Sequence, residues 1–227
     1  MLGAKGPMDG LWIADLLGEG VIHDIRNAVA AAPEASRPAV IAHLQLPTGQ
    51  HFDVAVHRQK QGAILEFEPS FRRTQPLQLA REMIGRVKDI NDIDLLISAS
   101  AKLVRTVLGY DRVMVYRFEE DGSGKVASEA KRHDLESFLG QYFPATDIPR
   151  QARILYMQNP IRIISDARGL RVDLLPQAEE RAAPLDLSFA HLRSVSPIHC
   201  EYLRNMGVSA SMSISIIVDG KLWGLIA

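Results

Sequence analysis

Residues 112–130, RVMVYRFEEDGSGKVASEA, decide the fold, because they read as a strand, a tight turn and a second strand. In the first strand, Val113 and Val115 point to one face and Tyr116 points to the other. Both faces carry large side chains, so this strand is expected to be covered on both sides. The Asp-Gly-Ser-Gly run that follows is typical of a hairpin turn. The stretch therefore predicts an antiparallel sheet.

Helices and further strands follow this hairpin. The expected helices are 150–159 and 196–206, the second ending at Gly207, and the expected strands are 161–164, 208–218 and 221–227. Strand 208–218 alternates in steps of two, which places Ser211, Ser213 and Ser215 on one face.

Before the hairpin, apolar residues recurring at i, i+3 and i+4 predict helices 77–90 and 93–108, and Gly109 is suited to end the second one. Further upstream the expected elements are a helix at 22–31, then strands at 39–46, 51–57 and 62–68, and then a linker at 69–76. The fold class is therefore α+β. A first domain at 1–70 holds a partial antiparallel sheet, and a second at 77–227 holds an antiparallel sheet flanked by helices.

Both domains are expected to be incomplete. The upstream sheet would have an uncovered edge, which suggests that strands precede Met1. The last residues, Leu222 to Ala227, form an apolar strand without a turn or cap after it, which suggests that the second domain continues.

Composition limits the partners and the compartment. The 227 residues are 47% hydrophobic with a net charge of −1, which favours neither nucleic acid nor an anionic membrane as partner. Cys200 is the single cysteine, so no intrachain disulfide can form and a cytoplasmic location is expected. No apolar run reaches the roughly 18 residues that a membrane helix needs.

The stretch Phe143-Pro-Ala-Thr-Asp-Ile-Pro149 is a candidate binding loop. Its two prolines restrict the backbone on both sides of Asp147, just before an expected helix. Asp147 is therefore held in a defined place, where it could bind a ligand. The alternative is that Asp147 only caps the helix, because Asp is a favoured N-cap residue.

The stretch Ser196-Pro-Ile-His199 is a second candidate. Ser196 suits an N-cap, so His199 falls in the first turn, where the helix dipole disfavours a charged imidazole. Tyr202 is three residues on and shares the helix face with His199, and Arg193 supplies a cation upstream. The alternative is a buried histidine that hydrogen-bonds to the backbone.

Taken together, these motifs resemble those of bacterial phytochromes over nearly the whole chain. The segments that carry the resemblance are Asp111–Phe118, Phe143–Pro149, Leu192–His199, Tyr202–Gly207 and Leu222–Ala227. The resemblance implies a PAS-like domain with its N-terminal part missing at 1–70. It implies a GAF domain with its C-terminal end missing at 77–227, which binds a linear tetrapyrrole (bilin).

The resemblance also assigns roles to individual residues. It implies that Asp147, with Ile148 and Pro149 in the same loop, contacts the pyrrole nitrogens, and that His199 shares in their protonation. The two propionates would be held by Arg162 and Arg193, because a guanidinium can grip a carboxylate with two bonds. The hydroxyls around them would be those of Ser196, Ser211 and Ser213. The wall around the isomerising D ring would be Tyr116, Tyr202 and Phe143.

The attachment of the pigment departs from the family pattern. Bacterial members attach biliverdin through a cysteine ahead of the first PAS strand, and other members use a cysteine just before the helix histidine, where this chain has Ile198. Cys200 follows that histidine instead. It is a candidate for attachment, and the alternative is a small packed thiol.

The function implied is red and far-red light sensing by photoisomerisation of biliverdin, in a cytoplasmic homodimer that signals to a histidine kinase outside this chain. The chain itself is not expected to be an enzyme. An active site of His199, Asp147 and Cys200 is disfavoured, because adjacent helical residues do not face each other. The remaining alternative is a GAF domain without bilin, which binds a cyclic nucleotide or a protein partner or serves for dimerisation.

Overall fold

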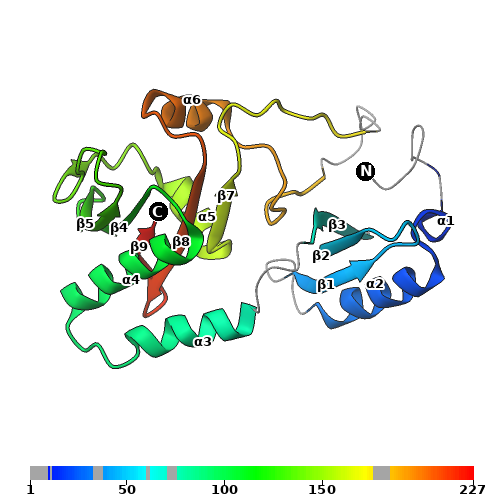
Figure 1. The fold of residues 1–227 in the computed structure, drawn as a ribbon. Helices are drawn as coiled ribbons and strands as arrows, with labels where there is room; N and C mark the ends of the chain where they lie inside the picture. Colours follow the sequence, from blue (N-terminus) through cyan, green and yellow to red (C-terminus); the bar gives the residue numbers. More distant parts are fainter. Residues whose placement is uncertain (1–9, 11, 33–37, 60–61, 71–75, 176–184) are drawn as a thin grey trace. The chain divides into compact units, whose positions relative to one another are not determined.

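The computed structural model describes residues 10, 12–32, 38–59, 62–70, 76–175 and 185–227 (Figure 1). The chain divides into two compact units, and neither is one continuous stretch. The first unit is Met1–Arg73 with Gly169–Pro197, and the second is Thr74–Arg168 with Ile198–Ala227. Segment 169–197, which lies inside the predicted second domain, thus belongs to the first unit. Most of the predicted linker at 69–76 lies outside the described residues.

The first unit contains an antiparallel sheet in the order β1-β2-β3, as predicted. Two helices precede it, of which the short first one was not predicted. Apolar residues of α2, Val21, Ile22 and Ile25, are buried with Val54 and Val56 of β2 in one core. The elements are α1 (Ile13–Leu17), α2 (Glu19–Ala31), β1 (Ala39–Gln45), β2 (His51–Gln59) and β3 (Gly62–Pro69).

The second unit contains a sheet in the order β6-β5-β4-β9-β8-β7, in which every neighbouring pair is antiparallel. Its strands are β4 (Arg112–Phe118), β5 (Gly124–Lys131), β6 (Tyr142–Phe143), β7 (Ile161–Ile164), β8 (Ser211–Val218) and β9 (Lys221–Ile226). Its helices are α3 (Pro76–Val87), α4 (Ile93–Leu108), α5 (Arg150–Gln158) and α6 (Pro197–Asn205). The predicted helix 93–108 and strand 161–164 match α4 and β7 residue for residue, and β4 and β5 form the predicted hairpin.

The two faces of this sheet carry different helices. On one face, Ile97, Ala101 and Val104 of α4 pack against Val113 and Val115 of β4. Both ends of α4 have local signals: the Asp92 side chain accepts a hydrogen bond from Leu95 N, and Gly109 ends the helix with a φ of 74°. The predicted stop at Gly109 is confirmed.

The other face carries α5, and the candidate residues Tyr116, Phe143 and Ile148 pack here. Tyr116 of β4, Val126 of β5, Tyr156 of α5 and Leu225 of β9 form its buried cluster. The alternation of β4 thus divides its side chains between two cores, as expected for a strand covered on both sides. No helix in the described part of the chain is long and apolar enough to cross a membrane.

Candidate functional site

Four aromatic side chains form a row on the α5 face, called here the aromatic row: Phe138, Phe143, Tyr116 and Phe118. The Tyr116 ring lies 5.4 Å from Phe118 in an edge-on arrangement and 6.1 Å from Phe143, measured between ring centroids. Phe143 in turn lies 6.3 Å from Phe138, at 77° between the ring planes. The Tyr116–Phe118 and Phe143–Phe138 pairs are edge-to-face contacts, which are favourable at these distances, and the Tyr116–Phe143 pair is tilted at 50°.

Two glycines make room for Tyr116 in the middle of the row. A Cβ at Gly124 of β5 would lie 1.9 Å from Cζ of the Tyr116 ring. A Cβ at Gly224 of β9 would lie 2.4 Å from the Tyr116 carbonyl oxygen. Neither position can carry a side chain without moving Tyr116. A glycine inside a strand is the sequence signal for such a close approach, and it was not used in the prediction.

Tyr116 keeps its proton over a wide pH range. Burial raises its pKa, the negative charge of Asp147 raises it further, and Arg153 opposes the shift, leaving a pKa of about 12. The phenol is therefore neutral near pH 7 and can donate a hydrogen bond to a ligand.

Asp147 does not cap the helix that follows it. The N-cap of α5 is Pro149, and no side chain accepts a bond there, so the capping alternative is wrong. The Asp147 backbone N–H instead closes a turn on the Pro144 carbonyl at 3.1 Å. Its exposed carboxylate accepts a hydrogen bond from the Tyr202 hydroxyl at 3.4 Å. The Asp147 side chain is thus directed to Tyr202 on α6.

Arg153 holds this loop against the β4–β5 hairpin. Its Nε donates to the Ile148 carbonyl at 2.8 Å, and its Nη2 donates to the Gly122 carbonyl in the hairpin turn. Its guanidinium also lies 4.4 Å from the centre of the Phe118 ring, at the end of the aromatic row. Arg153 was not predicted as a site residue, because its hydrogen-bond partners are backbone carbonyls with no sequence signature.

His199 and Tyr202 share one face of α6, as their spacing predicts, and their rings stack with centroids 6.3 Å apart and 12° between planes. Burial lowers the pKa of His199, and the charge of Arg162 lowers it further, so the imidazole is neutral near pH 7. Burial and Asp147 raise the pKa of Tyr202. Within the described residues no hydrogen bond satisfies the His199 ring, so the alternative of a backbone-satisfied histidine finds no support there.

Arg162 is next to the predicted serines in the sheet. It pairs with Ser213 in the β7–β8 register, and Ser211 lies two residues along β8. The Arg162 guanidinium lies 5.3 Å from the centre of the Tyr156 ring. Among the described residues it forms no hydrogen bond and no ion pair, so its five N–H groups are available to an anion.

Two predicted site residues, Arg193 and Ser196, lie outside the second unit, whereas Cys200 lies within it. Arg193 and Ser196 belong to the first unit, where Arg193 Nη1 donates to the Ala190 carbonyl at 2.6 Å, and their role as ligand contacts stays a prediction. Cys200 is a free, half-buried thiol beside His199 on α6. The second unit also contains all the other predicted residues, namely Tyr116, Phe143, Asp147, Ile148, Pro149, Arg162, His199, Tyr202, Ser211 and Ser213.

This arrangement can bind a large, flat, anionic ligand. The aromatic row offers an apolar surface, Arg162 and Ser213 offer donors to a carboxylate, and His199 offers a neutral imidazole. The described residues hold no group of three or more His, Cys, Asp or Glu suited to a metal ion.

Comparison with known proteins agrees with these features. The GAF domain profile matches residues 92–227, and the PAS fold profile matches residues 1–70. A bacteriophytochrome of Pseudomonas aeruginosa is 51% identical over 185 residues, which cover 78% of this chain and 25% of that protein. Cyanobacterial phytochrome B of Nostoc is 46% identical over 185 residues, covering 78% of this chain and 24% of that protein.

A solved structure agrees as well. The chromophore-binding domain of a Stigmatella aurantiaca phytochrome superposes with a TM-score of 0.78 at 41% identity, covering 92% of this chain and 71% of that one. The fold is therefore α+β with PAS and GAF domains, as predicted. The chain spans about a quarter of the length of the curated relatives described above.

Proposed function

This chain belongs to the phytochrome family, and from that premise we propose that it binds a linear tetrapyrrole, biliverdin, and serves as the light-sensing module of a longer protein. The observation that carries the proposal is that the guanidinium of Arg162, which has no hydrogen-bond or ion-pair partner in the described part of the chain, lies close enough to His199 to lower the pKa of its imidazole, in the unit that holds the aromatic row. A bilin presents carboxylates, pyrrole nitrogens and a conjugated plane, and each finds a matching group in this unit.

The residues present fit the pigment. When bound, biliverdin supplies absorption of red and far-red light and a double bond that can isomerise. Arg162 and Ser213 would bind a propionate, since a planar guanidinium can make two parallel bonds to a carboxylate. His199 would accept or donate a hydrogen bond at the pyrrole nitrogens. Tyr116 and Phe143 would exclude water and limit the space open to a rotating ring.

The hydrogen bond between Asp147 and Tyr202 would respond to rotation of the pigment ring. Their hydrogen bond is long, at 3.4 Å, and the carboxylate is exposed, so an added partner can compete for it. Arg153 keeps the backbone of this loop in place while the side chain exchanges partners. This loop is thus suited to be the first part of the protein to respond to a change in the pigment.

The proposal extends to the intact protein, of which this chain is about a quarter if it resembles its relatives in length. We expect a homodimer in the cytoplasm whose signal reaches a histidine-kinase module beyond this chain. Attachment through Cys200 is not part of the proposal. We expect biliverdin to bind without a covalent bond, because the half-buried Cys200 thiol follows His199 in place of preceding it.

The test is to mix the purified chain with biliverdin and record the visible spectrum before and after red and far-red light. The expected result is a red-region band that changes reversibly with illumination. Arg162→Ala should weaken pigment uptake, whereas Arg150→Ala, an exposed arginine at the start of α5, should not. Absence of any pigment band in the unaltered chain would contradict the proposal and favour the alternative of a GAF domain without bilin.

A further inference from the structure

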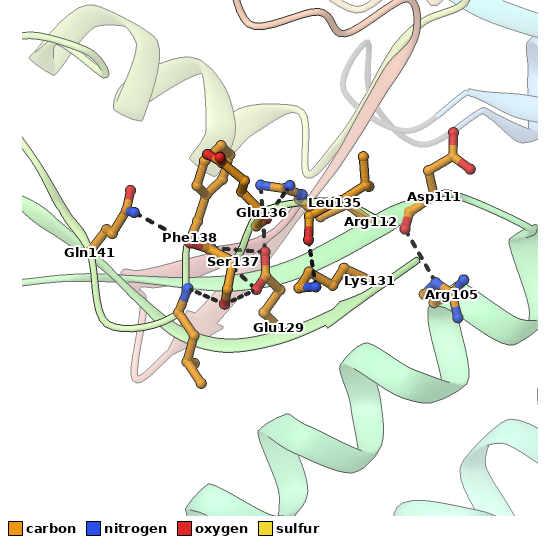
Figure 2. Close-up of polar contacts among 11 residues, drawn as sticks. Arg105, Asp111, Arg112, Glu129, Lys131, Leu135, Glu136, Ser137, Phe138 and Gln141 are labelled. Atoms are coloured by element: carbon orange, nitrogen blue, oxygen red, sulfur yellow. Dashed lines mark hydrogen bonds and ion pairs between the residues drawn. The ribbon is translucent and has the colours of Figure 1, made fainter. Parts of the chain in front are cut away.

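A buried carboxylate lies beneath the loop that carries one end of the aromatic row. The Glu129 side chain, on β5, is only 2% exposed. Its Oε2 accepts a hydrogen bond from the Ser137 hydroxyl at 2.6 Å, and both its oxygens lie 3.2 Å from the Phe138 backbone N–H. Figure 2 shows Ser137, Phe138 and Arg112 gathered about this carboxylate.

Arg112 grips the same loop from β4. Its Nη1 lies 3.5 Å from Glu129 Oε1, and its Nη2 donates to the Glu136 carbonyl at 2.6 Å (Figure 2). Its guanidinium carbon lies 3.8 Å from the centre of the Phe138 ring, close enough for a cation–π contact. Phe138 is therefore held twice, by its backbone through Glu129 and by its ring through Arg112.

The Arg112 and Glu129 side chains are largely removed from water, at 17% and 2% exposed. Burying a carboxylate and a guanidinium costs desolvation, which the ion pair recovers only with good geometry and further hydrogen bonds. Within the described residues, every polar contact of the Glu129 carboxylate goes to Arg112 or to Ser137 and Phe138. The contacts that offset the desolvation cost therefore all bind the loop that carries Phe138.

Phe138 passes this restraint to the centre of the row. Its ring packs edge-on against Phe143, which packs against Tyr116. Arg112 and Tyr116 lie four residues apart on β4 and so point to the same face of the sheet. A shift at Phe138 therefore opens space beside Phe143, and through it beside Tyr116.

We infer that Glu129 and Arg112 are positioning residues for the aromatic row, and that they set how tightly the row confines the ligand of the second unit. The photochemical part of this inference rests on the proposed bilin function; the structural part does not. A pair that fixes Phe138 narrows the space beside Phe143, so it slows any rotation of a bound ring past the row.

The central variant is Glu129→Gln, which keeps the size of the side chain but replaces one acceptor oxygen by an NH2 group. Both oxygens face donors, so one donor loses its partner. The matched control is Glu136→Gln in the same loop, which removes the same charge from an exposed side chain. Arg112→Lys tests the partner, because lysine keeps the charge and loses the planar fork.

The first readout needs no pigment. Hydrogen exchange of the Phe138 amide should be faster in Glu129→Gln than in the unaltered chain, and unchanged in Glu136→Gln. Should Glu129→Gln fail to fold, Ser137→Ala removes a single hydrogen bond to the same carboxylate and should show the same effect in weaker form. Equal exchange of Phe138 in all these proteins would overturn the inference.

The second readout uses the chain loaded with biliverdin. Thermal return of the light-made state should be at least about threefold faster in Glu129→Gln and Arg112→Lys, since a small loss of confinement lowers the rotational barrier. Glu136→Gln should return at the unaltered rate. Equal return rates in pigment-loaded Glu129→Gln and Glu136→Gln would overturn the inference. If the unaltered chain takes up no biliverdin, the proposed function fails together with the photochemical part, and amide exchange still decides the structural part.

Discussion

His57 Nε2 lies 2.6 Å from Glu66 Oε2 in the first unit, and both side chains are almost completely buried. The same carboxylate accepts hydrogen bonds from the backbone N–H groups of His191, at 2.9 Å, and Leu192, at 2.6 Å. One side chain on β3 thus ties segment 169–197 to the sheet of the first unit.

Glu66→Ala should lower the free energy of unfolding by about 3 kcal/mol, because it leaves a buried His57 and two backbone donors without their acceptor. Urea unfolding followed by circular dichroism measures the change. Glu68→Ala is the control, since Glu68 is exposed on the same strand. Equal unfolding midpoints for the two variants would show that Glu66 does not stabilise the segment.

The contribution of Glu66 should also depend on pH. Burial raises the pKa of Glu66. The backbone hydrogen bonds from Leu192 and His191, together with the hydrogen bond and the charge of His57, lower it by more, so the pKa lies below its ordinary value of 4.5. The ionised form is therefore favoured by folding. Its stabilisation is fully present above about pH 4.5 and is lost as the pH falls through the lower pKa of the folded protein.

Unfolding of Glu66→Gln and of the unaltered chain at several pH values checks this. The difference in stability should be largest near neutral pH and should shrink in acid, because protonated Glu66 resembles glutamine. Other acidic groups with lowered pKa values are common to both proteins and cancel in the comparison. A difference that grows as the pH falls would contradict the sign of the shift.

Gly124→Ala should destabilise the second unit by roughly 1–3 kcal/mol, because the new methyl group overlaps the Tyr116 ring. Urea unfolding measures the loss. Gly85→Ala is the control: its Cβ would meet nothing within 4 Å on α3, so stability should stay the same or rise by up to about 1 kcal/mol. Equal stability of Gly124→Ala and the unaltered chain would mean that Tyr116 is not confined as the structure shows.

Asp147→Asn should lower the pKa of both Tyr116 and Tyr202, because the negative charge of Asp147 raises both. Alkaline titration of the phenolate absorbance in the ultraviolet measures the change, which should be a shift of part of the curve to lower pH. Asp219→Asn, at an exposed turn of the same unit, should leave the curve unchanged. Overlapping titration curves for the two variants would argue against the placement of Asp147 beside these phenols.

The elements that were predicted well have their start and stop signals close in sequence. The bounds of α4 follow from an apolar repeat between Asp92, which caps it, and Gly109, which ends it. By contrast, β6 is two residues long and exists because Tyr142 and Phe143 return to pair with β5. No local pattern marks such a strand.

The site residues likewise fall into those with a local sequence signal and those without one. The shared face of His199 and Tyr202 follows from helical spacing alone. The capping alternative for Asp147 failed because Pro149 sets the start of α5 two residues later. The contacts of Glu129 and Arg153 depend on the path of a loop and on backbone carbonyls, so periodicity and residue type could not predict them.

The two-part make-up of the first unit affects the order in which the chain can fold as a ribosome makes it. The sheet that carries His57 and Glu66 leaves the ribosome early, but the N–H groups that Glu66 binds come 125 and 126 residues later. Until then, only His57 of these partners is present, and water or another donor must take the places of the two N–H groups on Glu66. The first unit can therefore reach its final form only when most of the second has been synthesised.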